Sequence, residues 1–578
     1  MWKSLKVGAA LSAVLLFGLA GCNQSPTAVV PKGPSLASQN WDKLTAGFIE
    51  SYFEGQPFFA AQSGRHEFDG QLPDWSAGGI AHEIARLHAV RERTLEFRNS
   101  ILSDAERFER DSVVARIDRD LFWAESAEAP FRNPAFYIDS LDPSPYLTRD
   151  YAPLAQRLRV FIGFEHAIVT AVAQIKANLH LPLARPLLER GLSAANGFAV
   201  FYQKDVPKAF VSVADPRLQA EFKQSNAAAA AAMRDLASWL LANRKNATDN
   251  FALGEEKFTQ MLAATERVTT PLAELEASGR ADLERNLAAL REACTALLPG
   301  KSVRDCVAKV AHDKPDGGPV AGARKQLAQL RSFIEAKAIV SIPGTEQALV
   351  NEAPPYNRDN FAYIDIPGPY EKGIASVYYI APPNPSWTAQ AQHDYLPGRA
   401  DLLFTSVHEV WPGHFLQFLH SNRSGSIVNR VFVGYAFAEG WAHYGEEMMW
   451  EEGLGEGNPE THVGQLLNAL LRDVRFLSSI GMHTHGMKLA ESEQLFREQA
   501  YADAGTARQQ AARGAYDPAY LNYTMGKLMI RKLRDDWTAS RGGRAAWRDF
   551  HDRFLSYGGP PIPMVRAVMM GNDKGPLF

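Results

Sequence analysis

The sequence has few cysteines and almost no net charge. Cys22, Cys294 and Cys306 are the only cysteines in 578 residues, and the formal net charge is -4. A chain without a basic excess lacks the electrostatic footprint of nucleic-acid binding, so we expect no nucleic-acid partner. With 46% hydrophobic and 22% charged residues, the composition is that of an ordinary globular protein with ample material for a large core.

Long hydrophobic runs are also absent after the N-terminal segment. No later apolar run reaches about 18 residues, which is the length typical of a membrane-spanning helix. We therefore expect the body of the protein to be soluble.

The N-terminal segment has the order of a bacterial lipoprotein signal. Two early lysines precede an apolar stretch over residues 7–18, which is too short to span a membrane as a folded helix. Residues 19–22, LAGC in one-letter code, resemble a lipobox. We therefore predict that residues 1–21 are a signal peptide and that Cys22 is lipidated; an ordinary signal peptide with an incidental cysteine is the alternative. Several acyl chains, each contributing roughly 0.8 kcal/mol per buried methylene, would anchor the protein stably.

A flexible tether is predicted after the lipidated cysteine. Residues 22–38 are rich in proline, serine and small side chains. Asn23, rather than an aspartate, follows Cys22, which by resemblance to Gram-negative lipoproteins favours the outer membrane. We therefore expect a cell-envelope lipoprotein that is anchored in the outer membrane and faces the periplasm.

Cys294 and Cys306 are close together in the sequence. In an oxidising compartment such a pair indicates a disulfide that closes a short loop. Two free buried thiols are the alternative.

Most of the chain after the tether has helical periodicity. Apolar residues recur every three or four positions in several segments: 80–97, 105–124, 154–178, 224–246, 258–298 and 320–338. The sequence therefore predicts a mainly α fold. Residues 39–578 are expected to form a single helical catalytic unit, which could divide into two lobes over about 39–340 and 341–578.

A small β element is predicted near residues 360–381. Residues 361–366 and 376–380 are β-branched and aromatic segments bounded by proline and glycine, which is typical of strands. Such a strand could bind an extended peptide along its edge, or it could be a structural hairpin that covers the core.

Residues 406–417 hold the densest group of candidate metal ligands. His408 and Glu409 resemble the start of the HExxH motif, in which two histidines hold zinc and the glutamate takes a proton from water. His414 follows six residues after His408 instead of four, so a regular helix would place the two about 120° apart. Pro412 cannot donate a backbone hydrogen bond and Gly413 tolerates unusual backbone angles, so we predict a break or bulge there.

A third ligand is expected from a second apolar, helix-like run over residues 431–450. Glu439 is the candidate, and His443 and Glu446 follow on the same helix as residues that could orient the ligands. His443 could also replace His414 as a ligand, because Glu439 and His443 have i,i+4 spacing.

These motifs together resemble the bacterial family known as domain of unknown function 885. The residues that carry the resemblance are His408-Glu409, Pro412-Gly413-His414, Gln417, Glu439-Gly440-Trp441-Ala442, Tyr444 and Glu446. Further matches to the family are Pro57, Gly64, Phe68-Asp69, Arg475, Gly481-Met482-His483 and Tyr523-Thr524-Met525-Gly526. The resemblance therefore covers nearly all of the mature chain. His443 stands where the family usually has an apolar residue, and Ser479 where an acidic residue is common.

The resemblance implies a lipid-anchored zinc metallopeptidase related to the gluzincins, with its site in a deep cleft between helical lobes. One Zn²⁺ would be held by three ligands: His408, His414 and Glu439. Glu409 would be the general base for hydrolysis of a peptide bond by a metal-activated water.

Two residues on later helices are candidates for stabilising the oxyanion. Tyr523 is the first choice and His483 the second, because related peptidases use a tyrosine or histidine from a later helix. Arg475 could receive a substrate carboxylate or pair with a glutamate of the site.

Two other functions stay open. The chain could be a non-catalytic, lipid-anchored binding protein on a degenerate peptidase scaffold, or a zinc hydrolase of another amide such as a peptidoglycan stem peptide. The sequence decides neither the physiological substrate nor the mode of cleavage.

Overall fold

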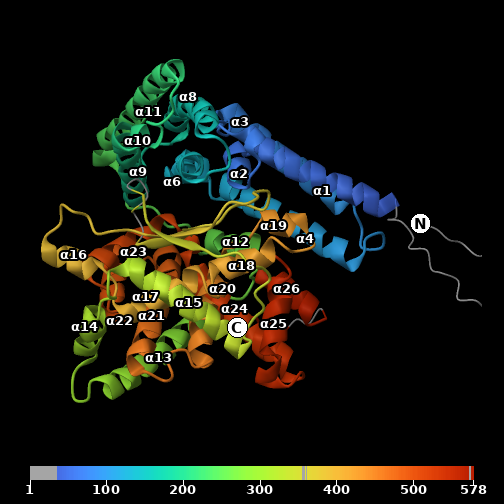
Figure 1. Ribbon diagram of the computed structural model, residues 1–578. Coiled ribbons are helices and arrows are strands. Elements are labelled where there is room, and N and C mark those ends of the chain that lie inside the picture. Colours follow the sequence, from blue (N-terminus) through green and yellow to red (C-terminus); the bar gives the residue numbers. More distant parts are fainter. Residues whose placement is uncertain (1–35, 355–357, 359–360, 572–574) are drawn as a thin grey trace, which may run out of the picture.

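The computed structural model describes residues 36–354, 358, 361–571 and 575–578. Cys22 and the predicted signal peptide lie outside the described residues. Within them, helices dominate and three short strands form one sheet, which confirms the prediction of a mainly α fold with a small β element. Figure 1 shows two groups of helices, one above the other.

The upper group comes from the N-terminal part of the chain. Its helices are α1 (Leu36–Gly55), α2 (Pro57–Gln62), α3 (Ala77–Leu95), α5 (Ala129–Arg132), α6 (Ala135–Ile138), α7 (Ser144–Thr148), α8 (Leu154–Asn178), α9 (Arg185–Lys204), α10 (Val206–Ala209) and α11 (Pro216–Asn243). The long helix α11 packs against both α8 and α9 in the upper part of Figure 1. Below them, α4 (Asp104–Leu121) contacts α3 and also the lower group through α12.

Helix α8 is the core helix of this upper bundle. It is long and apolar enough to cross a membrane, judged by length and composition, and half of that window is buried inside the protein. Its side chains at Leu158, Phe161 and Ile168 are fully buried. Glu165 and His166 interrupt the apolar run, which is why the sequence shows no continuous stretch here.

The lower group contains the rest of the chain. Its helices are α12 (Glu255–Glu266), α13 (Leu272–Leu297), α14 (Val303–His312), α15 (Pro319–Lys337), α16 (Ala389–Tyr395), α17 (Arg399–Glu409), α18 (His414–Ser421), α19 (Ile427–Val431), α20 (Tyr435–Glu451), α21 (Pro459–Thr484), α22 (Leu489–Gln499), α23 (Ala504–Tyr516), α24 (Asn522–Ala539), α25 (Trp547–Leu555) and α26 (Ile562–Met569). Most of their buried apolar side chains form one hydrophobic cluster, which includes those of α12–α15.

The sheet has the strand order β1-β3-β2. Strands β2 (Ala362–Asp365) and β3 (Val377–Ile380) correspond to the two predicted segments and pair antiparallel. β1 (Leu349–Glu352) pairs parallel with β3 and was not predicted, because only Val350 of this short segment is buried and no alternating pattern is visible. This order leaves β2 at one edge of the sheet, in contact with α17.

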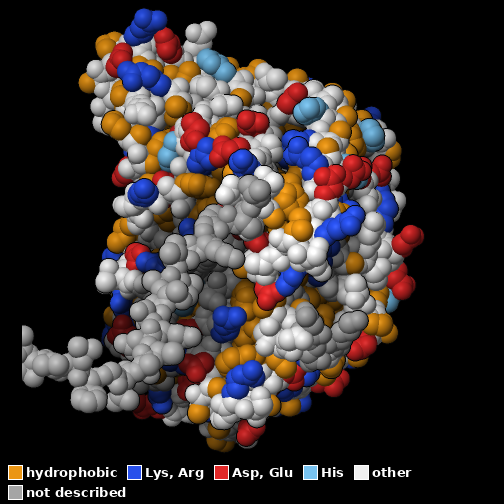
Figure 2. Space-filling model, turned by 90° about the vertical axis from the view of Figure 1, so that its right-hand side faces the viewer, with side chains coloured by type: hydrophobic (Ala, Val, Ile, Leu, Met, Phe, Trp, Pro, Cys, Tyr) orange, Lys and Arg blue, Asp and Glu red, His pale blue; other side chains and the backbone are white. Residues whose placement is uncertain are grey.

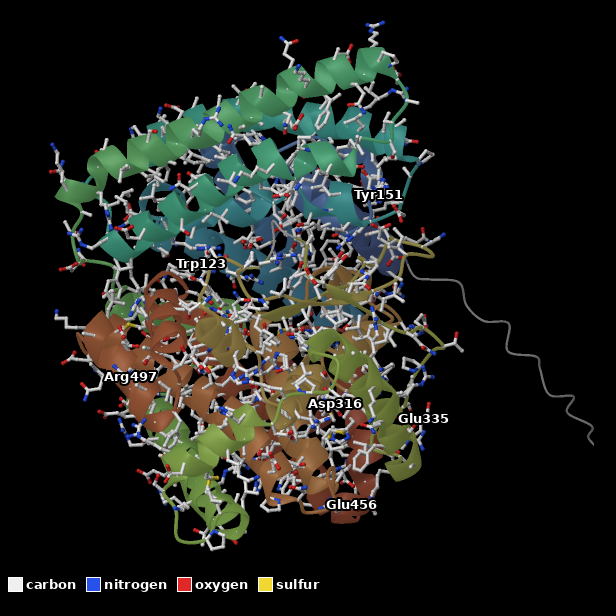
Figure 3. All side chains as sticks on the ribbon, turned by 60° about the vertical axis from the view of Figure 1, so that its left-hand side comes forward. Trp123, Tyr151, Asp316, Glu335, Glu456 and Arg497 are labelled. Carbon is white, nitrogen blue, oxygen red and sulfur yellow. A yellow bond between two sulfur atoms is a disulfide. The ribbon has the colours of Figure 1, made fainter. Side chains whose placement is uncertain are left out.

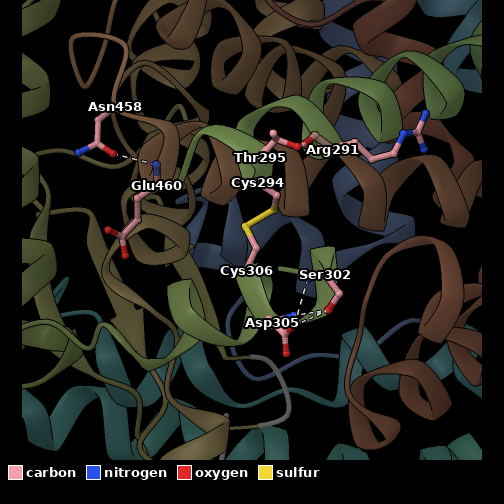
Figure 4. Close-up of a disulfide and its surroundings, with 8 residues drawn as sticks. All are labelled: Arg291, Cys294, Thr295, Ser302, Asp305, Cys306, Asn458 and Glu460. Atoms are coloured by element: carbon pink, nitrogen blue, oxygen red, sulfur yellow. Dashed lines mark hydrogen bonds between the residues drawn. A yellow bond between two sulfur atoms is a disulfide. The ribbon is translucent and has the colours of Figure 1, made fainter. Parts of the chain in front are cut away.

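The predicted helical run over residues 258–298 is divided into α12 and α13. Arg267 adopts a left-handed conformation with φ 59°, and Pro271 directly precedes α13. A left-handed residue ends the regular helix, and proline cannot donate the backbone bond that would continue it. Figure 4 shows that Cys294 near the end of α13 is joined by a disulfide to Cys306 of α14, with Cα atoms 5.6 Å apart.

Burial of Glu165 makes the stability of the upper bundle depend on pH. This side chain is fully buried on α8 and accepts a hydrogen bond from Ser225 of α11. Burial raises the pKa of Glu165 to about 8 from an ordinary value of 4.5, although the bond from Ser225 opposes the shift. Between pH 4.5 and about pH 8, Glu165 keeps its proton in the folded state and loses it in the unfolded chain. The free energy of unfolding therefore falls by up to about 1.4 kcal/mol per pH unit as the pH rises through this range.

We expect Glu165→Gln to remove this pH dependence. The free energy of unfolding, measured by denaturant titration near about pH 5 and about pH 8, should fall more steeply in the unmodified protein than in the variant. The same fall in both proteins would show that Glu165 is ionised in the folded state.

Candidate metal centre

The helix that carries His408 ends where the sequence predicts a break. Helix α17 stops at Glu409 and α18 begins at His414. A Cβ atom on Gly413 would lie 1.7 Å from the backbone oxygen of His408, so only glycine fits this turn. Trp441 of α20 donates a hydrogen bond from Nε1 to the backbone oxygen of Pro412 (2.7 Å), which fixes the turn against the neighbouring helix.

The break brings three candidate ligands together. The Nε2 atoms of His408 and His414 lie 3.2 and 3.3 Å from Oε2 of Glu439. One donor atom from each of these residues falls within 4.8 Å of the other two. Two imidazoles and one carboxylate are the protein ligands of many catalytic zinc sites, so the donor set fits this metal.

Close packing of α20 against α24 positions Glu439. A Cβ atom on Gly440 would lie 2.5 Å from the Cα of Gly526, so the two backbones nearly touch where the helices cross. This approach sets Glu439, the neighbour of Gly440, beside the histidines. It also brings the first turn of α24, which carries Tyr523, to the same place.

Glu446 and Arg472 lie at Nδ1 of His408, the ring nitrogen that does not face Glu439. The Nδ1 of His408 lies 2.7 Å from Oε1 of Glu446, and Nη2 of Arg472 lies 3.3 Å from the same oxygen. Burial opposes the charge of Glu446, but Arg472 and the histidines hold its pKa well below the ordinary value. A carboxylate on Nδ1 leaves Nε2 of His408 free to face Glu439, which is the usual arrangement behind a metal-binding histidine.

His443 is not part of the ligand group. Its Nδ1 lies 3.4 Å from Oε2 of Glu446, and its Nε2 is buried without a hydrogen-bond partner among the described residues. Burial lowers its pKa to about 4, so the ring is neutral at pH 7. Of the two histidines that the sequence left open, His414 is the one that lies with His408 and Glu439.

Glu409 lines the cleft together with the three candidate ligands. Burial raises its pKa, and the nearby histidines oppose the shift while Glu439 adds to it. For His408, burial favours the neutral form, but hydrogen bonds that its ring donates to Glu439 and Glu446 raise its pKa to about 9. A carboxyl whose pKa moves toward neutral is suited to exchanging protons at physiological pH.

Tyr523 stacks beside the ligands. Its ring centroid lies 6.1 Å from that of His408, with 21° between the ring planes. Nη2 of Arg513 donates a hydrogen bond to Tyr523 Oη (3.4 Å), so the hydroxyl can still donate its own proton. Burial raises the pKa of Tyr523, which keeps the proton in place.

His483 does not reach the site. Its Nδ1 accepts a hydrogen bond from the backbone N–H of Leu253 (3.2 Å), and its Nε2 donates to the backbone oxygen of Gly514 (2.8 Å). Its ring packs against Phe251 and Phe258. The prediction of His483 as an oxyanion donor is therefore wrong, because both ring nitrogens are used in joining α21 to its neighbours.

A network of buried charged and polar side chains connects four helices next to the site: α13, α20, α21 and α24. Lys527 of α24 is fully buried and pairs with Asp282 of α13 and with Glu447 of α20, the latter at 3.4 Å. Asn286 of α13 donates to Asp473 of α21 (2.7 Å). Removal of one partner from such a network leaves a buried charge without compensation, so the network fixes how the helices sit.

A large cleft opens over the candidate ligands. Its volume is about 3010 Å³, and side chains from both groups of helices line it, including Glu83 of α3, Arg190 of α9 and Asp401 of α17. Trp123, another lining residue, lies between the upper and lower groups in Figure 3. Figure 2 shows charged side chains of both signs interspersed on one face of the molecule, in keeping with the small net charge.

The comparisons with known proteins agree with this fold. The model of a bacterial protein family of unknown function, DUF885, matches residues 57–569. The chain belongs to the DUF885 family. No curated protein matches the sequence.

Two solved structures resemble this DUF885 protein. One is a candidate lipoprotein of unknown function from Shewanella oneidensis, with TM-score 0.76 and 23% identity over 92% of this chain and 99% of that chain. The other is a candidate lipoprotein from Colwellia psychrerythraea, with TM-score 0.76 and 17% identity over 93% of this chain and 99% of that chain. At these identities the likeness shows the fold alone.

Sequence reasoning missed Arg472, Tyr435 and Arg513 as neighbours of the site. Arg472 precedes Arg475 by three positions on the same helix, a spacing that places two side chains on one face. That spacing was the available signal. Arg513 pairs locally with Asp517, four residues later, but the contacts of Tyr435 with Arg513 and Asp517 join segments that are far apart in the chain and leave no local pattern.

We expect His414→Ala to lose zinc and His443→Leu to retain it. Only His414 shares the ligand group with His408 and Glu439, whereas His443 turns toward Glu446. Zinc per chain, measured by atomic absorption after dialysis, should separate the two variants. Glu446→Gln should keep the metal but weaken its affinity by about 10–100-fold. Retention of zinc by His414→Ala, with loss from His443→Leu, would overturn this ligand set.

Proposed function

We propose that the protein is a zinc-dependent hydrolase of peptide bonds. The observation that carries the proposal is the convergence of three donor atoms, from His408, His414 and Glu439, at the floor of a large cleft with Glu409 beside them. This combination supports hydrolysis, because a zinc-binding trio beside a carboxylate base supplies what attack by water on an amide needs.

Zinc held by the three ligands would lower the pKa of water and polarise the scissile carbonyl. Glu409 would take a proton from the attacking water and pass it to the leaving amine. Tyr523 would donate a hydrogen bond from its hydroxyl to the oxygen that gains negative charge, and would keep its proton. Glu446 and Arg472 would keep His408 oriented throughout.

The edge strand β2 supports a peptide as the substrate. Residues 361–366, which include this strand, line the cleft that holds the candidate ligands. An edge strand offers backbone donors and acceptors to an extended chain. A folded protein would bring its own bulk into the cleft, so an extended peptide suits the site better.

We further propose that the protein is a lipoprotein anchored through Cys22 in the outer membrane and facing the periplasm. The lipobox over residues 19–22 supports this proposal. The two similar structures are candidate lipoproteins by description, which agrees with it.

We expect Glu409→Gln to bind zinc stoichiometrically and to lose turnover by about 10²–10⁴-fold, because the amide cannot take a proton. Cleavage of a peptide library by zinc-loaded protein, followed by mass spectrometry, gives the rates. Glu335→Gln, an exposed position on α15 labelled in Figure 3, is the matched control and should keep full activity. Full activity of Glu409→Gln would show that another group is the base, and unmodified protein without turnover in the presence of zinc would favour a binding protein.

Replacement of Cys22 tests the anchor. Cys22→Ala expressed in a Gram-negative host should leave the membrane fraction, because no acyl chain can attach. Metabolic labelling with a radioactive fatty acid should mark the unmodified protein and not the variant. A variant that remains in the outer-membrane fraction would contradict anchoring through Cys22.

A further inference from the structure

Two arginines, Arg475 and Arg513, lie on one wall of the cleft, and only Arg513 is paired with a carboxylate among the described residues. Arg513 of α23 lies 3.1 Å from Asp517 and donates a hydrogen bond to Tyr435 Oη (2.8 Å). Arg475 of α21 lies over the Tyr523 ring, with its guanidinium carbon 4.7 Å from the centroid. Asp517 therefore compensates Arg513, and Arg475 has no acidic partner among the described residues.

The hydrogen bonds of Arg475 leave most of its donors unused. Its Nε donates to Oε1 of Gln510 (2.7 Å), and no other hydrogen bond of its guanidinium is found within the described part of the chain. Arg475 and Gln510 both line the cleft, so the remaining N–H groups can meet a bound molecule. A guanidinium presents its donors in a planar fork that matches the two oxygens of a carboxylate.

The burial of Arg475 makes this arrangement costly without a ligand. Only 7% of the residue is exposed. Burial lowers its pKa, and the neighbouring charge of Arg513 lowers it further. A buried cation without a counter-ion destabilises the fold, so its presence in a cleft indicates an anion that arrives from outside.

The position of Arg475 indicates which anion this is. The Tyr523 ring contacts both the Arg475 guanidinium and the His408 ring, so one aromatic side chain separates the cation from the candidate metal centre. An anion bound there lies near the bond to be cut. In a peptide, the group that carries a negative charge at the end of the chain is the C-terminal carboxylate.

We propose that Arg475 and Gln510 bind the C-terminal carboxylate of the substrate, so that the enzyme removes residues from the C-terminus of peptides. This inference rests on the proposed hydrolase function, but carboxylate binding itself can be measured without turnover.

The experiment compares three peptides of the same length on zinc-loaded Glu409→Gln protein, in which hydrolysis is blocked. One peptide has a free C-terminal carboxylate, the second a C-terminal amide, and the third an amide together with an aspartate at its last position. Calorimetry should show that the free acid binds about 10–100-fold more tightly than the plain amide, the value of a charge-assisted pair.

Arg475→Gln, added to this protein, should reduce the free-acid preference to near one while the affinity for the amide stays the same. Arg475→Lys, which keeps the charge without the fork, should restore part of the preference. The matched control is Arg86→Gln: Arg86 also lines the cleft, but Glu83 neutralises it at 2.6 Å, so the preference should persist.

Equal binding of acid and amide by the protein with Arg475 intact would overturn the proposal, and this comparison does not depend on any Arg475 variant folding. Binding of the aspartate amide as tightly as the free acid would also overturn it, because the site would then read a side chain. If no peptide is cleaved by the zinc-loaded protein with Glu409 intact, the hydrolase function fails, and the binding comparison still decides whether Arg475 recognises a terminal carboxylate.

Discussion

The turn between α17 and α18 is the constraint on which the site depends. Gly413 lies so close to the backbone oxygen of His408 that no side chain fits there, and Trp441 holds Pro412 from the adjacent helix. A continuous helix would direct His408 and His414 to different sides. Because the turn packs against α20, the same contact that fixes the two imidazoles also fixes the helix that carries Glu439.

Buried charge is compensated almost everywhere around this centre. Glu446 lies between His408 and Arg472, and Lys527 lies between two acidic residues of neighbouring helices. Each such group would destabilise the fold if its partner were lost. Against this background Arg475 differs, since its neighbours within the described residues supply an aromatic face and one amide oxygen but no negative charge.

The arrangement of the two helix groups explains why the site is both enclosed and reachable. The candidate ligands belong to the lower group, where one hydrophobic cluster holds α17, α20, α21 and α24 in place. The upper group, with its own core around α8, supplies the opposite wall of the cleft. A rigid floor and a separately packed wall allow a deep opening without loss of ligand geometry.

The sequence by itself determined the helical class, the two strands over residues 361–366 and 376–380, the position of the helix break, and a short set of candidate ligands in which His414 and His443 were alternatives. These features have local causes: periodicity, and the backbone properties of Pro412 and Gly413. Only the tertiary structure decided between His414 and His443, assigned His483 to backbone contacts with Leu253 and Gly514, and revealed β1. Each of these outcomes depends on atoms that are distant in the chain, and side-chain direction at such contacts is set by the packing of whole helices.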